Sequence, residues 1–295
     1  MNKGKKVRKI GIVGLKSKKE VREMTSFLCA LLEKSGIEPV VESTLGEASG
    51  VSQLAEAKEI PTLADMVFSL GGDGTFLSAV RLLSGSSIPV LGINLGGLGF
   101  LAECKVDEAE KMLKKIASGD YRVERRDMFA VRVEEKGKTV WEGEALNEVV
   151  VNCGKATRII DLELHIDGSH ITTFKADGII CSTPTGSTGY SLSAGGPVVY
   201  PTLPLAVITP ICPHTLANRP LVVSNENEIR FRTPASAPDE KLTATVDGQM
   251  ETPLKLRQEV VVTKSGSSVN LVKSPFVDYF SILKTKLMWA TRNKG

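Results

Sequence analysis

The chain has 295 residues, of which 42% are hydrophobic and 24% charged, a balance typical of a globular protein with a substantial buried core. The formal net charge is only +3, which excludes a protein-wide electrostatic attraction to nucleic acid as the mode of action. No apolar run approaches the ~18 residues of a membrane helix, and the five cysteines never show CxxC spacing, which disfavours a zinc ribbon or a disulfide framework. We therefore expect a cytoplasmic protein with reduced, mostly buried thiols and with neither nucleic-acid nor membrane partners.

The first part of the chain alternates short apolar runs with helical spacing. The strand candidates read "RKIGIVGL", "EPVVES", "DMVFSL" and "IPVLGIN". Helical faces are indicated by Val21, Met24, Leu28, Leu31 and Leu32 after the first run, and by Ala109, Met112, Leu113 and Ile116 after the last. This alternation predicts βαβ units and a mainly parallel, Rossmann-like sheet, in which ligands gather at the carboxyl ends of the strands.

After Asp120 the apolar period changes to two. Segments such as "MFAVRVEEKGKTVWEGE" and "LELHIDGSHITTF" predict paired strands, the second with a hairpin turn at Asp167-Gly168. The last segment returns to helical spacing through Phe280, Leu283 and Leu287. The predicted fold class is α/β plus all-β: a Rossmann-like α/β domain over residues 1–120, a strand-rich domain over 121–274, and a helix within 275–295 that packs back on the first domain.

Three glycines surround one aspartate in "SLGGDGTF", where a predicted strand meets a predicted helix. The motif lacks the lysine of the P-loop and the spacing of GxGxxG. One interpretation is an ordinary turn in which Asp73 or Thr75 caps the helix. The other is a phosphate site, because glycines let the backbone approach an anion at a helix start and an aspartate can accept a hydroxyl proton. The motif alone leaves both open.

Three further segments have both a structural and a functional interpretation. The hydroxyls and glycines of "TPTGSTGYSLS" suit either a surface loop or a ligand groove. Asn147 and Glu148 suit either an exposed polar pair on an edge strand or a ligand contact, because an amide can read a base edge and a carboxylate can accept from sugar hydroxyls. Asp177 suits either a turn or a polar ligand contact. No two histidines have zinc-ligand spacing, and His165 and His170, which flank the predicted hairpin, are expected to face solvent.

"GGDGT" followed by an apolar helix resembles the NAD kinases, the diacylglycerol and sphingosine kinases and, more distantly, the 6-phosphofructokinases. Four later stretches single out the NAD kinases: "EALNEVVV", "KADGIICSTPTGSTGYSLSAGGP", "ITPICPHTLANRP" and "TVDGQ". The resemblance runs from about Ile10 to the end and keeps the family's order of motifs. One departure is Gly189, where the family usually has alanine.

The resemblance implies an ATP-dependent phosphorylation of the 2′-hydroxyl of the adenosine ribose of NAD, with Asp73 as proton acceptor and a divalent cation, Mg²⁺, accompanying the donor. It implies donor contacts at Gly71, Gly72, Gly74 and Thr75, no metal-ligating side chain, and a homo-oligomer (dimer or tetramer). The residues that it assigns to NAD are Asp73, Gly74, Asn147, Glu148, Arg158, Lys175, Asp177, Thr188, Gly189, Tyr190, Ser191, Leu192, Ser193 and Gln249.

Two other functions are compatible with "GGDGT". A lipid kinase would need an apolar substrate channel, which the polar "TPTGSTGYSLS" segment disfavours. A non-catalytic NAD(P) sensor on the same scaffold would not need Asp73 and the glycines to be intact. The residues leave open whether ATP or polyphosphate is the donor, and whether NAD or NADH is preferred.

Overall fold

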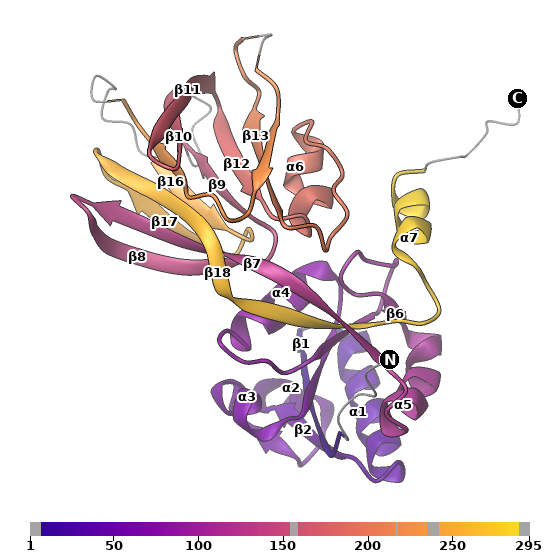
Figure 1. The fold of residues 1–295 in the computed structure, drawn as a ribbon. Helices are drawn as coiled ribbons and strands as arrows, with labels where there is room; N and C mark the ends of the chain where they lie inside the picture. The colour runs from indigo at the N-terminus through magenta and orange to yellow at the C-terminus, as the bar shows by residue number, and fades with distance from the viewer. Residues whose placement is uncertain (1–6, 154–158, 216–217, 235–241, 289–295) are drawn as a thin grey trace, which may run out of the picture. The chain divides into compact units, whose positions relative to one another are not determined.

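The computed structural model describes residues 7–153, 159–215, 218–234 and 242–288. The chain forms two compact units, the first from residues up to Arg125 and from Val269 onward, the second from Arg126–Ser268. The unit boundaries fall inside two long strands, β7 (Arg122–Glu135) and β18 (Gln258–Lys273), rather than in a linker (Figure 1). Arg158 lies outside the described residues.

Unit 1 contains a parallel sheet with the strand order β3-β2-β1-β4-β5. The last residues of β18 join it at Leu271, opposite Val90, and a short β6 also pairs with β5. All of these pairings are parallel, so the predicted Rossmann-like architecture is confirmed. The strand bounds are β1 Lys9–Gly14, β2 Glu38–Glu42, β3 Leu54–Ala55, β4 Met66–Leu70, β5 Val90–Asn94 and β6 Cys104–Lys105.

Helices cover both faces of this sheet. Ile10 and Ile12 of β1 share a buried cluster with side chains of α1 and α5. Gly11, between them, faces the opposite side, where a Cβ would lie 2.8 Å from Ile60 Cγ2 of α3. Because both faces are covered, every residue of β4 and β5 is buried. The helices of this unit are α1 Lys19–Lys34, α2 Ser43–Ser49, α3 Ile60–Leu63, α4 Asp73–Leu82, α5 Ala109–Ala117 and α7 Tyr279–Lys286, with 3₁₀ turns at Ala57–Glu59 and Val106–Glu108.

The predicted helical faces match the structure except in the last helix. Four of the five predicted residues of α1 and all four of α5 are buried. In α7, whose start is capped by Asp278, the buried side chains are those of Tyr279, Ile282 and Leu283. The prediction for Phe280 is wrong, because it is 58% exposed. Leu283 is buried as the spacing predicts, but Tyr279 and Ile282 complete the inward face in place of Phe280.

Unit 2 is built from antiparallel strands in two sheets. In one sheet β11, β10, β15 and β18 are neighbours in that order, and β7 pairs with both β18 and β8. The other has the order β14-β13-β12-β9-β16-β17. The bounds are β8 Lys138–Ala145, β9 Glu148–Asn152, β10 Ile160–Ile166, β11 Ser169–Ala176, β12 Gly178–Ser182, β13 Leu205–Ile211, β14 Leu221–Ser224, β15 Ile229–Arg232, β16 Leu242–Val246 and β17 Met250–Leu254, with a 3₁₀ turn Gly186–Thr188 and a one-turn α6 Tyr190–Ser193.

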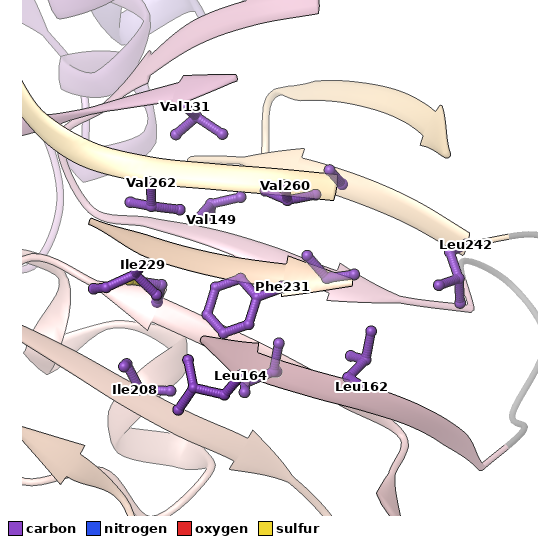
Figure 2. Close-up of a cluster of buried hydrophobic side chains, with 14 of the residues drawn as sticks. Val131, Val149, Leu162, Leu164, Ile208, Ile229, Phe231, Leu242, Val260 and Val262 are labelled. Carbon is purple, nitrogen blue, oxygen red and sulfur yellow. The ribbon is translucent and has the colours of Figure 1, made fainter. Parts of the chain in front are cut away.

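The inner faces of the two sheets enclose the core of unit 2. Figure 2 shows the ring of Phe231 from one sheet among aliphatic side chains of both, including Val149, Ile208 and Leu164. Alternate residues along each strand point into this layer, as the period of two predicts. The core is therefore that of a β-sandwich, which confirms the strand-rich second domain.

The predicted hairpin turn and the predicted exposure of His165 have different outcomes. β10 and β11 pair through a turn at Asp167-Gly168 with φ values of 48° and 79°, so the hairpin is confirmed. His165 is only 7% exposed, and its Nε2 lies 3.1 Å from Glu163 Oε2, so the prediction that it faces solvent is wrong. A bulge between Leu164 and His165 breaks the alternation, and both side chains are buried.

Four cysteines are buried as predicted, and Cys212 is exposed. Among the described residues, no helix is long and apolar enough to cross a bilayer.

Candidate active site

The "GGDGT" segment forms the turn from β4 into α4, as the sequence predicts. Gly71 has φ 148°, and a Cβ there would lie 2.4 Å from Thr75 Oγ1, so the turn requires glycine. The helix N-cap is Gly72, and no side chain caps it. The interpretation in which Asp73 or Thr75 caps the helix is therefore wrong, because the carboxylate of Asp73 points elsewhere.

Asp73 binds the loop that follows β5. Its carboxylate accepts hydrogen bonds from the backbone N–H groups of Phe100 (2.9 Å), Leu101 (3.0 Å) and Ala102 (3.0 Å). A Cβ on Gly99 would lie 2.1 Å from Asp73 Oδ1, so glycine is what lets this loop approach. An ionised carboxylate has about four acceptor positions, so three bonds fix its orientation and leave one for a ligand hydroxyl.

In unit 2, the carboxylate of Asp247 fixes the backbone at Asn147 and Glu148. Its carboxylate accepts the backbone N–H groups of Leu146 (2.9 Å), Asn147 (2.7 Å) and Glu148 (3.1 Å). The backbone N–H of Asp247 donates to Glu148 O at 2.9 Å. Asp247 itself has φ 50°. The turn between β8 and β9 is thus fixed by one residue about a hundred positions later in the chain.

The hydroxyl-rich segment holds the same turn from the other side. Thr183 donates its N–H to Asn147 O (2.8 Å) and its hydroxyl to Leu146 O (2.5 Å). A Cβ on Gly186 would lie 2.3 Å from Asn147 O, so this contact also requires glycine. Asn147 and Glu148 are therefore positioned by backbone bonds on both sides, which leaves their side chains available to a ligand.

Two polar side chains converge beside Gly189. A Cβ on that glycine would lie 3.2 Å from Glu148 Oε2 and 3.9 Å from Asn147 Nδ2. Glu148 Oε2 is buried and, within the described residues, has no hydrogen-bond partner. A buried acceptor without a partner costs free energy unless a ligand satisfies it. An amide and a carboxyl side by side can recognise a base edge and a sugar hydroxyl.

Burial is the main cause that raises the pKa of Glu148 from 4.5 to about 8, and the nearby charge of Asp247 is the second cause of the same shift. Without a ligand the carboxyl is therefore largely protonated at neutral pH. The earlier alternative, an exposed polar pair on an edge strand, is wrong, because Glu148 is only 8% exposed and β9 lies between β12 and β16.

Most hydroxyls of "TPTGSTGYSLS" stabilise the segment itself. Ser187 Oγ bonds Pro184 O and Val199 O, and Ser191 Oγ bonds Thr209 Oγ1 at 2.9 Å. Thr185 Oγ1 accepts from the buried guanidinium of Arg126. Ser191 is fully buried, so its hydroxyl faces the interior rather than a groove. The residues with exposed surface are Thr188, Gly189, Tyr190, Leu192 and Ser193.

The other predicted residues lie at the surface of their own units. Lys175 is exposed on β11, Asp177 is half-buried between β11 and β12, and Gln249 is half-buried in the β16–β17 turn. In unit 1, Gly72 and Gly74 are exposed and Thr75 is half-buried. No cluster of His, Cys, Asp or Glu suited to a metal occurs in the part of the chain that the structure describes. Sequence reasoning missed Gly99, Arg126 and Asp247, although Asp247 stands in the quoted "TVDGQ".

Comparison with known proteins identifies the chain's family. The model of the ATP-NAD kinase N-terminal domain matches residues 10–121, and that of the C-terminal domain matches residues 146–274. An NAD kinase of Geobacter sulfurreducens is 44% identical over 97% of this chain and 100% of its own length. The chain belongs to the NAD kinase family. An NAD kinase of Geobacter metallireducens is 46% identical over 90% of this chain and 93% of its own.

Solved NAD kinase structures share the fold. A yeast NADH kinase complexed with NADH has a TM-score of 0.88 at 26% identity, over 97% of this chain and 89% of its own. An NAD kinase from Archaeoglobus fulgidus in complex with ATP has a TM-score of 0.75 at 29% identity, over 95% and 98%. As a member of the NAD kinase family, the chain is an enzyme, a kinase. The lipid kinase and the non-catalytic sensor are therefore set aside.

The raised pKa of Glu148 predicts how stability depends on pH in this NAD kinase family member. The folded-state pKa of Glu148 lies above its ordinary value, so its protonated form stabilises the folded state. This contribution to the free energy of unfolding is complete below about pH 4.5 and is lost as the pH rises through about 8. Urea unfolding at pH 5 and at pH 8 measures this change. Between these two pH values the free energy of unfolding should fall less for Glu148→Gln than for the parent protein. The exposed Glu142→Gln is the control, and an unchanged pH dependence in Glu148→Gln would contradict the assignment.

Proposed function

We propose that the chain transfers the γ-phosphoryl group of ATP to the 2′-hydroxyl of the adenosine ribose of NAD, giving NADP. The observation that carries this proposal is the carboxylate of Asp73, which three backbone N–H groups orient at the start of α4 with one acceptor position left. The relatives named NAD kinase, and the solved NADH and ATP complexes of similar structures, support the choice of substrates.

Unit 2 is proposed to bind NAD. The amide of Asn147 suits a base edge, and the partnerless Oε2 of Glu148 suits a ribose hydroxyl, whose hydrogen would satisfy it. Thr188, Gly189, Tyr190, Leu192 and Ser193 would lie along the dinucleotide, whereas the buried Ser191 would hold the segment in shape through its bond to Thr209. Asp177 is assigned to the nicotinamide carboxamide, Lys175 and Arg158 to the pyrophosphate or a subunit contact, and Gln249 to the end of the groove.

Unit 1 is proposed to bind Mg–ATP as a substrate. Gly71, Gly72, Gly74 and Thr75 would contact the phosphates through backbone N–H groups at the start of α4 and the Thr75 hydroxyl. The carboxylate of Asp73 already accepts three backbone bonds and offers no cage for a cation. The Mg²⁺ would therefore be held mainly by the donor's own phosphates and by water, its usual preference.

The chemistry then needs one proton acceptor. The 2′-oxygen forms a bond to the γ-phosphorus while the bond from that phosphorus to the β–γ bridging oxygen breaks, and ADP leaves with the electron pair. Asp73 orients the hydroxyl and accepts its proton late, which suits a loose transition state with little need for early deprotonation. The three amides keep the carboxylate from turning away from the acceptor.

A direct assay tests the function. Pure protein with NAD, ATP and Mg²⁺ should form NADP, detected by reduction with glucose-6-phosphate dehydrogenase and its substrate. Parallel reactions with polyphosphate in place of ATP, and with NADH in place of NAD, define the donor and the acceptor. Absence of product with every donor and metal would contradict the proposal. A cytoplasmic homo-oligomer is proposed on the family resemblance, and analytical ultracentrifugation is the check on its size.

A further inference from the structure

The loop that orients Asp73 is rich in glycine. Over residues 95–103 it reads "LGGLGFLAE", and the N–H groups of residues 100–102 donate to the carboxylate. Glycine adopts many backbone conformations, so the three glycines do not by themselves fix where these N–H groups lie. Two side chains from the C-terminal part of unit 1 contact the loop, one at each end of the donor residues.

The first contact is an ion pair just after the donor residues. Glu103 is buried, and its carboxylate pairs with the ammonium group of Lys273. Lys273 is the last residue of β18, and two residues earlier Leu271 pairs with Val90 of β5. Removing one partner of a buried ion pair leaves an uncompensated charge, which is strongly unfavourable. The pair therefore ties this end of the loop to the sheet.

The second contact is an aromatic pair at the first donor residue. The ring centroids of Phe100 and Tyr279 lie 6.3 Å apart, and the ring planes are inclined at 52°. At this separation aromatic rings attract each other. Tyr279 is the first residue of α7 and is buried, together with Ile282 and Leu283 of the same helix. The Asp278 carboxylate caps α7, so the position of Tyr279 is fixed by the helix that it begins.

We propose that Lys273 and Tyr279 are positioning residues for the phosphoryl transfer. They hold the loop at Glu103 and at Phe100, and the N–H groups of the loop in turn hold the Asp73 carboxylate toward the acceptor hydroxyl. The segment that runs from the end of β18 to α7 thus acts on the reaction through the loop (Figure 1). Neither residue is among the proposed substrate contacts, so its loss affects kcat rather than substrate binding. The inference rests on the proposed function for the role of Asp73.

Two substitutions remove the contacts, and each has a conservative variant and a matched control. Tyr279→Leu removes the ring, Tyr279→Phe keeps it, and Phe276→Leu changes an exposed ring of the same segment. Lys273→Met removes the ammonium group, Lys273→Arg keeps the positive charge, and Lys284→Met makes the same change at an exposed position of α7. The double variant Glu103→Gln/Lys273→Met removes both charges, so it tests the pair without leaving one of them uncompensated.

Tyr279→Leu, Lys273→Met and the double variant should each lower kcat by about tenfold or more, because a displacement of about 1 Å near a reacting group can cost about 10²-fold. Dissociation constants for NAD and for Mg–ATP, each measured alone by isothermal titration of the full chain, should change by less than about threefold. The conservative variants and the controls should keep the kcat of the parent. Weakened NAD binding with an unchanged kcat would overturn the positioning role.

Two further measurements distinguish positioning from a general loss of stability. Amide hydrogen exchange of the peptide that contains residues 100–102 should become faster in Tyr279→Leu and in the double variant, while exchange in β12 of unit 2 stays unchanged. In an Asp73→Asn background the same substitutions should lower kcat little further, because the carboxylate through which they act is absent.

An equal loss of kcat in both backgrounds would overturn the proposal, as would unchanged exchange and kcat in the folded double variant and in Tyr279→Leu. If the parent forms no NADP but the loop exchanges faster in the variants, the proposed function is refuted and the hold of the C-terminal segment on the loop is not.

Discussion

Asp73→Asn is expected to lower kcat by about 10²–10⁴-fold, the usual contribution of a general base. Asparagine keeps the size of the side chain but cannot accept the proton of the substrate hydroxyl. It also presents an NH₂ group to the backbone N–H groups of residues 100–102, so about 1–3 kcal/mol of stability should be lost as well. Initial rates at saturating NAD and ATP, with urea unfolding in parallel, measure both effects.

Gly99→Ala distinguishes the catalytic role of the Asp73 carboxylate from its role in binding the loop after β5. The new methyl group would start 2.1 Å from Asp73 Oδ1, so the loop or the carboxylate must shift while the carboxylate itself remains. We expect this variant to lose stability comparably but to retain much more turnover than Asp73→Asn. If the two variants have the same kcat, Asp73 acts only by holding the loop. Near-normal turnover in Asp73→Asn would remove it from the mechanism altogether.

Asp247→Asn is expected to raise the KM for NAD by an order of magnitude or more, with a smaller effect on the KM for ATP. Three backbone N–H groups around Asn147 and Glu148 would lose a charged acceptor, at about 1–3 kcal/mol for each group left unpaired, with non-additive sums. Asparagine tolerates the φ of 50° at this position, so the backbone itself is not the cause of the loss. Steady-state kinetics with each substrate varied in turn, together with urea unfolding, give the measurement.

Asp167→Asn is the matched control for that experiment. Asp167 also has a positive φ, of 48°, and also accepts a backbone N–H, that of Glu228, but it lies in the β10–β11 hairpin turn and is not among the predicted NAD contacts. It should leave both KM values unchanged. Removing the charge of Asp247 should also lower the pKa of Glu148 below about 8, because that charge is one of its two causes. A uniform loss of kcat with an unchanged KM for NAD would contradict the positioning role.

The sequence by itself determined which segments form elements and where the glycine-rich turn around Asp73 lies. The change of period from 3.6 to two separated helices from strands, and the apolar faces of α1 and α5 followed from spacing alone, because these patterns are local. The glycines around Asp73 and the order of the later motifs indicate the NAD kinase family without any geometry.

Tertiary structure decided what the polar groups face. Asp73 lies 27–29 residues before the backbone N–H groups that donate hydrogen bonds to it. Asp247 lies about 100 residues after the turn that it fixes. No local pattern could therefore reveal either set of hydrogen bonds. The burial of Glu148 and His165 and the exposure of Phe280 depend on which strands and helices become neighbours. Chain periodicity sets the phase of each element, but a side chain's partners and its charge state depend on residues that only folding brings together.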